Sequence, residues 1–71
     1  MSKTTLEKFG KKVREERIKQ GLSQEELASK AGVHRTYIGM IERAEKNITL
    51  ENIEKVAKAL KLNINELLTF E

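Results

Sequence analysis

Apolar residues recur every three or four positions along most of this 71-residue chain, which is the spacing of helices with one buried face. The pattern predicts five helices: about Thr5–Gln20, Ser23 to Gly32, His34 to Ile41 or Glu42, Thr49 to about Leu60, and a last one from Asn63 that carries residues up to Phe70. The sequence has no proline, and strong helix formers are abundant. We therefore expect an all-α, five-helix fold in a single domain, residues 1–71.

Capping residues mark where several of these helices begin and end. Ser23 followed by Glu26 forms a capping box, in which each side chain accepts a backbone N–H of the other residue, and Asn63 with Glu66 repeats the spacing. Gly32 is placed to end the second helix. Local chemistry as well as periodicity therefore marks both ends of the second helix and the start of the fifth.

Gly10 lies in the interior of the first predicted helix. Glycine there costs about 1 kcal/mol relative to alanine. That cost is tolerable if another helix packs close to this point, so Gly10 predicts a close helix crossing.

The second and third helices are separated by little more than Gly32, which can adopt the positive φ of a tight turn. Ala28 is small enough for a close crossing, and the apolar residues that would clamp the pair are Leu27, Ala31, Val33, Ile38 and Ile41. This spacing describes a helix-turn-helix unit. In such a unit, the N-terminal residues of the second helix meet base edges in the major groove of DNA.

The third helix opens with polar side chains, which suits a base-reading edge better than a core. Arg35 and Thr36 are the main candidates, because arginine donates bidentately to guanine and threonine offers a hydroxyl and a methyl to a thymine edge. Met40, one turn further on, is a third candidate through apolar contact. Gly39 beside it would let the helix approach the duplex closely. The pattern alone leaves open that these are ordinary solvated residues.

Composition narrows the chemistry that the chain can carry. Fourteen Lys and Arg against eleven Asp and Glu give a formal net charge of +3, which permits a nucleic-acid partner without demonstrating one. There is no cysteine, and His34 is the only histidine, so we expect no metal site and no cofactor. No carboxylate pair, nucleophile–base set or phosphate loop is recognisable, so neither an enzyme nor a small-molecule ligand is expected. No apolar run suggests a signal peptide or a membrane span, and a cytoplasmic protein is expected.

The segments GLSQEELA (21–28), AGV (31–33), YI (37–38) and IE (41–42) resemble the phage-repressor-like, Cro-type (xenobiotic-response-element) helix-turn-helix regulators. The resemblance covers about Phe9 to Leu68. More narrowly, HRTYIGMIERAEKNITLENIEKVAKAL (34–60) is similar to the controller proteins of restriction–modification systems, small dimeric regulators that often carry DRTYI and ERxxRN here. His34 replaces their aspartate, which should weaken the cap of the third helix. Lys46 replaces their arginine, which removes a bidentate fork.

The resemblance implies roles for residues around the predicted reading edge. Gln24 matches a position that binds phosphate, as suits a helix N-terminus, and the hydroxyl of Tyr37 is implied to reach DNA while its ring packs. Three residues after the third helix are expected to hold the DNA backbone: Arg43, Lys46 and Asn47. Arg17 and Glu42 resemble an ion pair that is structural in the family.

The resemblance also implies a homodimer that binds a pseudo-palindromic double-stranded DNA operator, with RNA polymerase as a further candidate partner. The candidate dimer interface is the last helix and consists of Ile64, Leu67, Leu68 and Phe70. Of these, Ile64 and Leu67 are expected to seal the helix onto the core, and Leu68 and Phe70 are expected to form the exposed patch. Two alternatives stay open: a phage-type repressor or antitoxin regulator, and a helical protein-interaction module that does not bind DNA.

Overall fold

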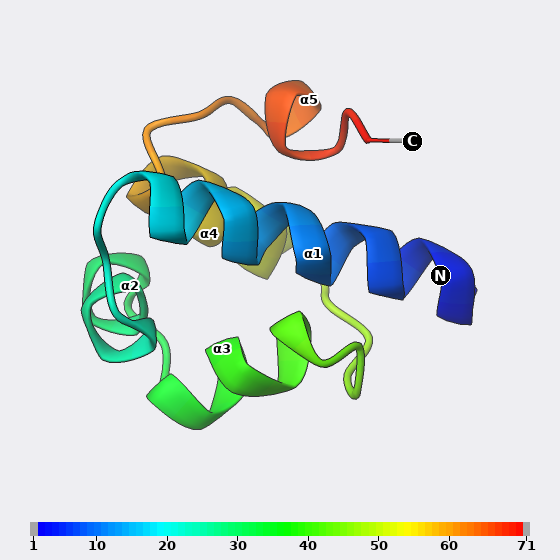
Figure 1. The fold of residues 1–71 in the computed structure, drawn as a ribbon, viewed down its shortest axis with the longest axis horizontal. Helices are drawn as coiled ribbons and strands as arrows, with labels where there is room; N and C mark the ends of the chain where they lie inside the picture. The colour runs from blue at the N-terminus through cyan, green and yellow to red at the C-terminus, as the bar shows by residue number, and fades with distance from the viewer. Residues whose placement is uncertain (1, 71) are drawn as a thin grey trace.

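The computed structural model describes residues 2–70, which form five helices and no strand (Figure 1). The helices are α1 (Lys3–Lys19), α2 (Gln24–Ala31), α3 (Arg35–Glu42), α4 (Leu50–Ala59) and α5 (Ile64–Leu67). The prediction of an all-α, five-helix domain is confirmed. None of the helices in the described part of the chain is long and apolar enough to cross a membrane.

The first helix begins two residues earlier than its apolar pattern indicates. The side chain of Ser2 accepts a hydrogen bond from the backbone N–H of Thr5, so it caps α1 and allows Lys3 to be the first helical residue. At the other end, Gly21 has a φ of 71°, and its backbone N–H donates to the carbonyl of Ile18. Glycine adopts a positive φ of this kind with the least strain, because it has no Cβ.

Both capping boxes form as predicted, at Ser23 with Glu26 and at Asn63 with Glu66. The hydrogen bond from the Ser23 backbone lowers the pKa of the Glu26 carboxyl, which keeps it ionised beside the positive end of the α2 dipole. The prediction for the last helix was too long. After Leu67 the helix ends, and Phe70 lies beyond it, outside any helix.

The core is a single cluster drawn from all five helices. Its fully buried large side chains are Phe9, Val13, Leu27, Ile38, Val56, Leu60 and Leu67. In Figure 1, α3 lies along the lower edge and α5 near the upper edge, with α1 running between them and contacting both. The helix-turn-helix pair and the C-terminal segment are therefore on opposite sides of the domain.

Gly10 lies where α1 crosses the end of α3, and it is buried. A Cβ atom at this position would collide with the carbonyl oxygen of Ile41 and lie 3.0 Å from that of Glu42. These are backbone atoms, which cannot rotate away. The close helix crossing that Gly10 predicts is therefore present.

The apolar residues of the C-terminal segment are less exposed than the sequence suggests. Leu67 is fully buried, as expected for a residue that seals the last helix onto the core, and a side chain with no accessible surface cannot itself contact a partner. Ile64, Leu68 and Phe70 are half-buried and pack against the core. The large apolar side chains that stand in solvent are instead Ile18 on α1, 56% exposed, and Leu50 at the start of α4, 73% exposed.

Candidate nucleic-acid interface

The α2–α3 pair has the geometry of a helix-turn-helix. Gly32 caps α2 with a φ of 72°, and the backbone N–H of Val33 returns to the carbonyl of Ala28. Leu27 and Ile38 are fully buried at the centre of the pair. The turn and the buried clamp together fix α3 on the surface with its N-terminal end exposed.

His34 is the N-cap of α3, where its side-chain Nδ1 accepts a hydrogen bond from the backbone N–H of Thr36 at 3.1 Å. An imidazole nitrogen therefore serves in place of the aspartate oxygen that the resemblance leads one to expect. A neutral imidazole lacks the negative charge that favours a helix N-terminus.

The predicted base-reading residues occupy the edge that α3 presents to solvent. Arg35 and Thr36 are exposed in the first turn, and Met40 is half-buried one turn further on. Gly39 differs from the prediction, because it is buried rather than exposed. The guanidinium of Arg43 covers it, with Nη1 3.0 Å from the position of an added Cβ. Gly39 thus makes room for the Arg43 side chain in this structure.

Tyr37 is half-buried, with its ring packed against the core. Its hydroxyl oxygen accepts a hydrogen bond from Nδ2 of Asn52 on α4 at 3.0 Å. The phenol proton is not used in that bond, so the hydroxyl can still donate to an outside acceptor such as a phosphate. Asn52 was not predicted as a functional residue, because nothing in the pattern of residues 50–60 distinguishes it from a solvated polar residue.

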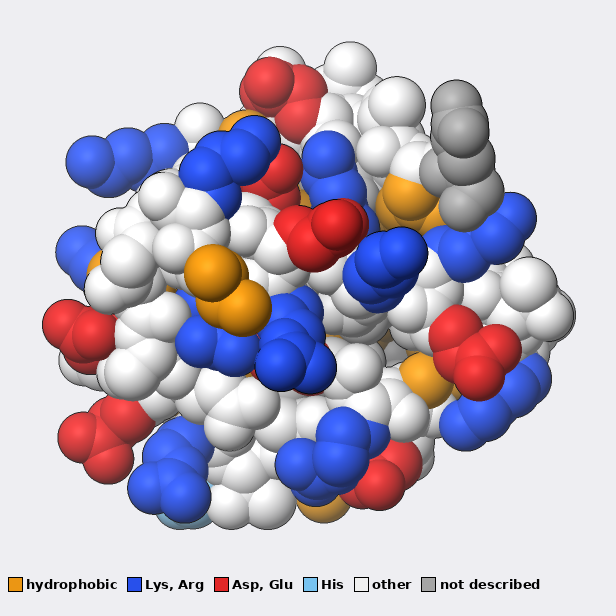
Figure 2. Space-filling model, in the orientation of Figure 1, with side chains coloured by type: hydrophobic (Ala, Val, Ile, Leu, Met, Phe, Trp, Pro, Cys, Tyr) orange, Lys and Arg blue, Asp and Glu red, His pale blue; other side chains and the backbone are white. Residues whose placement is uncertain are grey.

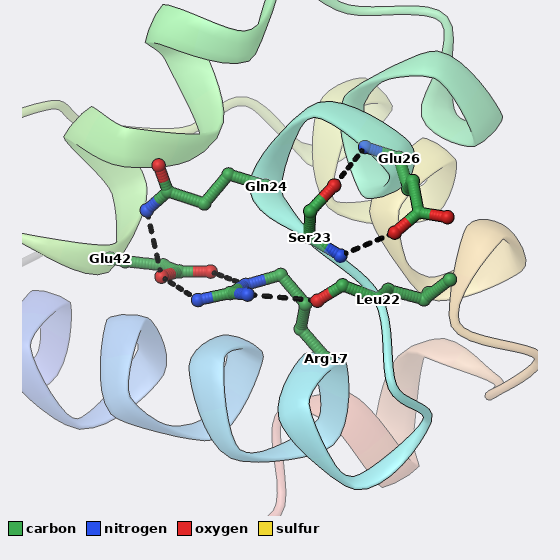
Figure 3. Close-up of polar contacts among 6 residues, drawn as sticks. All are labelled: Arg17, Leu22, Ser23, Gln24, Glu26 and Glu42. Carbon is green, nitrogen blue, oxygen red and sulfur yellow. Dashed lines mark hydrogen bonds and ion pairs between the residues drawn. The ribbon is translucent and has the colours of Figure 1, made fainter.

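Arg17 and Glu42 form a buried, two-pronged ion pair between α1 and the end of α3 (Figure 3). Arg17 Nε donates to Glu42 Oε2 at 2.7 Å, and its Nη2 donates to Oε1 at 3.0 Å. The third nitrogen, Nη1, donates to the carbonyl of Leu22 at 2.9 Å. With all three nitrogens engaged inside the protein, this arginine holds α1, α3 and the start of the turn into α2 together.

Gln24, in the first turn of α2, joins the same network. Its side-chain Nε2 donates to Glu42 Oε1 at 3.1 Å (Figure 3). A primary amide has two N–H donors, so one remains for a phosphate while the other fixes the side chain. Placement at the N-terminus of α2 adds the favourable helix dipole.

The segment that follows α3 carries the three residues predicted to hold the DNA backbone, and all are exposed: Arg43, Lys46 and Asn47. Arg43 Nε lies 3.1 Å from Glu45 Oε2, and this hydrogen bond lowers the pKa of the Glu45 carboxyl. Lys3 of α1 donates to the carbonyl of Ala44 at 3.0 Å, which ties the segment to the body of the domain.

An acidic residue lies beside the reading edge, which the sequence analysis did not anticipate. Glu25 of α2 places Oε2 4.0 Å from Nη1 of Arg35. Residues 34–41 contain no acidic side chain, but the turn folds α2 back so that Glu25 faces α3. Figure 2 shows the result, with acidic side chains close to Lys and Arg side chains along the edge where α3 lies.

The arrangement suits recognition of a polyanion with a readable edge. Arg35 and the amide of Gln24 lie near the start of α3, and the exposed residues Arg43, Lys46 and Asn47 follow its end. No group of acidic or histidine side chains in residues 2–70 could hold a metal ion. We find no nucleophile–base pair among these surface residues that would point to catalysis.

Comparison with known proteins agrees with the helix-turn-helix geometry of α2 and α3. A helix-turn-helix family model matches residues 13–67. The control protein C.BamHI of Bacillus amyloliquefaciens is 51% identical over 63 residues, which cover 87% of this chain and 78% of that protein. The control protein C.SmaI of Serratia marcescens is 51% identical over 57 residues, covering 80% and 68%.

Among solved structures, the restriction–modification controller protein C.AhdI from Aeromonas hydrophila superposes with a TM-score of 0.86 at 48% identity. The match covers 87% of this chain and 94% of that one.

Proposed function

The chain belongs to the helix-turn-helix family, among the restriction–modification control proteins, and from this membership we propose that it regulates the genes of a restriction–modification system as a homodimer on a pseudo-palindromic operator. It is a sequence-specific, DNA-binding transcriptional regulator. The observation that supports base reading by this protein is the exposed start of α3, where the side chains of Arg35 and Thr36 lie in solvent outside the core. Control is exerted by binding, without catalysis.

In this proposal α3 docks in the major groove with its N-terminal turn toward the bases. Arg35 donates to guanine O6 and N7, and Thr36 contacts the neighbouring base. Met40, half-buried on the same edge, adds an apolar contact. The long side chain of Arg35 reaches furthest, so it supplies most of the discrimination.

Phosphate contacts on both sides of the groove fix the register of α3. Gln24 binds one strand from the start of α2, and Tyr37 donates from its hydroxyl. The exposed residues after α3 hold the other strand: Arg43, Lys46 and Asn47. Gly39 contributes indirectly, because its missing side chain leaves room for the Arg43 guanidinium over α3.

The domain's architecture limits where the dimer contact can lie. Two α3 helices that bind one duplex must face the same way and lie about 34 Å apart. A twofold contact on the outer side of α5 would point them in opposite directions, because α5 and α3 are on opposite sides of the domain (Figure 1). A protomer measures 27 × 22 × 21 Å, so a lateral contact between protomers meets the spacing.

The lateral surface that fits is the α4 flank, which we define as Leu50, Glu54, Lys58 and the adjoining hollow with Leu62 and Ile64. Leu50, Glu54 and Lys58 follow one another at intervals of four residues, so they share a face of α4. In an isologous contact, Glu54 of each protomer can meet Lys58 of its partner while Leu50 is covered. Of the residues that the sequence analysis assigned to the interface, Ile64 belongs to this flank, and Leu68 and Phe70 do not.

The function is tested by selecting duplexes from a randomised pool with the wild-type protein. A pseudo-palindromic sequence with half-sites one helical turn apart is expected. Arg35→Ala should then cost about 1–3 kcal/mol on that sequence and relax the preference at one position per half-site. Lys11→Ala, which removes a charge near Phe70 on the far side of α1, is the matched control. Failure of the wild type to enrich any sequence would refute the proposal.

The dimer surface is tested by sedimentation at micromolar concentration. Leu50→Glu should give monomers and weaken operator binding, because it buries a charge in the contact. Phe70→Glu should leave the dimer intact. The opposite result would place the interface at the C-terminal segment, as the sequence pattern suggested.

A further inference from the structure

We propose that Glu25 is a specificity-determining residue, which positions Arg35 and directs it toward bases rather than phosphates. This inference rests on the proposed function, in which Arg35 reads a guanine. It starts from the ion pair between Arg35 Nη1 and Glu25 Oε2, 4.0 Å apart, which joins the first turns of α3 and α2.

The Glu25–Arg35 ion pair contributes little to the stability of the fold. Its side chains are 66% and 79% exposed, and an ion pair this open to water contributes little to stability. Arg17 and Glu42 already tie α3 to the rest of the domain with much shorter, buried contacts. The Glu25–Arg35 pair is therefore available for a role at the surface.

The space around Arg35 shows why its side chain needs a partner. Two surface hollows of about 430 and 280 Å³ flank it, and Glu25 and Arg35 line both of them. An unpartnered guanidinium could swing into either hollow. Attraction to Glu25 keeps it between them, on the side of α3 that faces outward, and this attraction strengthens when DNA displaces water.

Charge explains the preference for bases. An arginine beside a carboxylate is close to neutral overall, and the carboxylate repels nearby phosphates, so non-specific contacts lose affinity. A guanine edge is uncharged and accepts two hydrogen bonds. Because Glu25 attracts Arg35 by charge at 4.0 Å without a hydrogen bond, the guanidinium keeps its five N–H donors and can present two of them to guanine. The pair thus favours base reading over backbone binding.

The test compares wild type with Glu25→Gln on the duplex selected by the wild type and on a scrambled duplex of the same length. The variant should bind the scrambled duplex more tightly, with a steeper salt dependence. Its affinity for the selected duplex should not rise in step. The ratio of specific to non-specific affinity is expected to fall by about threefold to tenfold, a fraction of what one bidentate contact provides.

Two controls isolate the mechanism. Glu15→Gln makes the same charge change on α1, beside Lys8 and Lys11, and should leave the ratio unchanged. In an Arg35→Ala background, Glu25→Gln should no longer alter the ratio, because Glu25 acts through Arg35. Thermal melts of each variant show whether the fold is retained.

Equal changes in both affinities on Glu25→Gln would overturn the inference, as would a full effect in the Arg35→Ala background. Absence of any selected duplex for the wild type would instead refute the proposed function.

Discussion

Substituting Gly10 by alanine tests whether the crossing of α1 over α3 is as tight as the structure shows. The new methyl group would collide with the backbone carbonyl of Ile41, which cannot rotate aside. Overpacking of this kind costs up to about 3 kcal/mol. The helix propensity of alanine is about 1 kcal/mol more favourable than that of glycine. We therefore expect the free energy of unfolding to fall by about 2 kcal/mol.

For a domain of this size, whose total stability is about 4–10 kcal/mol, that loss is large. It corresponds to a fall in Tm of about 8–16 °C. Urea and thermal unfolding, followed by circular dichroism at matched protein concentration, measure it. DNA affinity should fall as well, because relief of the collision moves the end of α3.

Gly39→Ala is the matched control within the partner helix. Its added Cβ meets the tip of the Arg43 side chain at 3.0 Å, and a flexible tip can move. The gain in helix propensity should then dominate, giving a change between zero and about 1 kcal/mol of stabilisation. If Gly10→Ala were as stable as Gly39→Ala, the reasoning from the helix crossing would be refuted.

Three further predictions concern the interface and its supports. Lys46→Ala should weaken binding to all duplexes similarly and reduce the slope of log K against log salt by about one per contact removed; an unchanged slope would exclude Lys46 from the interface. Arg17→Met should lower the free energy of unfolding by about 3 kcal/mol, because it leaves Glu42 buried without its cation; a stable variant that cannot bind DNA would show that Arg17 acts at the DNA instead. His34→Asp should stabilise the domain by about 0.5–1 kcal/mol through a charged cap on α3, measured as a higher urea midpoint, whereas a lower midpoint would contradict the cap geometry.

Local sequence chemistry determined the helices and most of their ends. A capping box or a glycine C-cap needs only residues within one turn of each other, so Ser23 with Glu26 and the stop at Gly32 could be read directly. The same holds for the exposed start of α3, because periodicity places Arg35 and Thr36 off the buried face. The sequence predicted the start of the first helix and the end of the last helix less accurately, because few apolar positions remain at the ends of the chain to set a period.

Tertiary structure decided everything that depends on which residues meet across helices. Sequence could not place Glu25 beside Arg35 or Asn52 on the hydroxyl of Tyr37, because each pair joins two helices whose relative rotation is set by core packing. It could not show that Leu68 and Phe70 are half-buried while Leu50 is 73% exposed. The reason is physical: a hydrophobic pattern fixes the direction in which each helix buries its face, but only the packed domain determines how much of that face its neighbours cover.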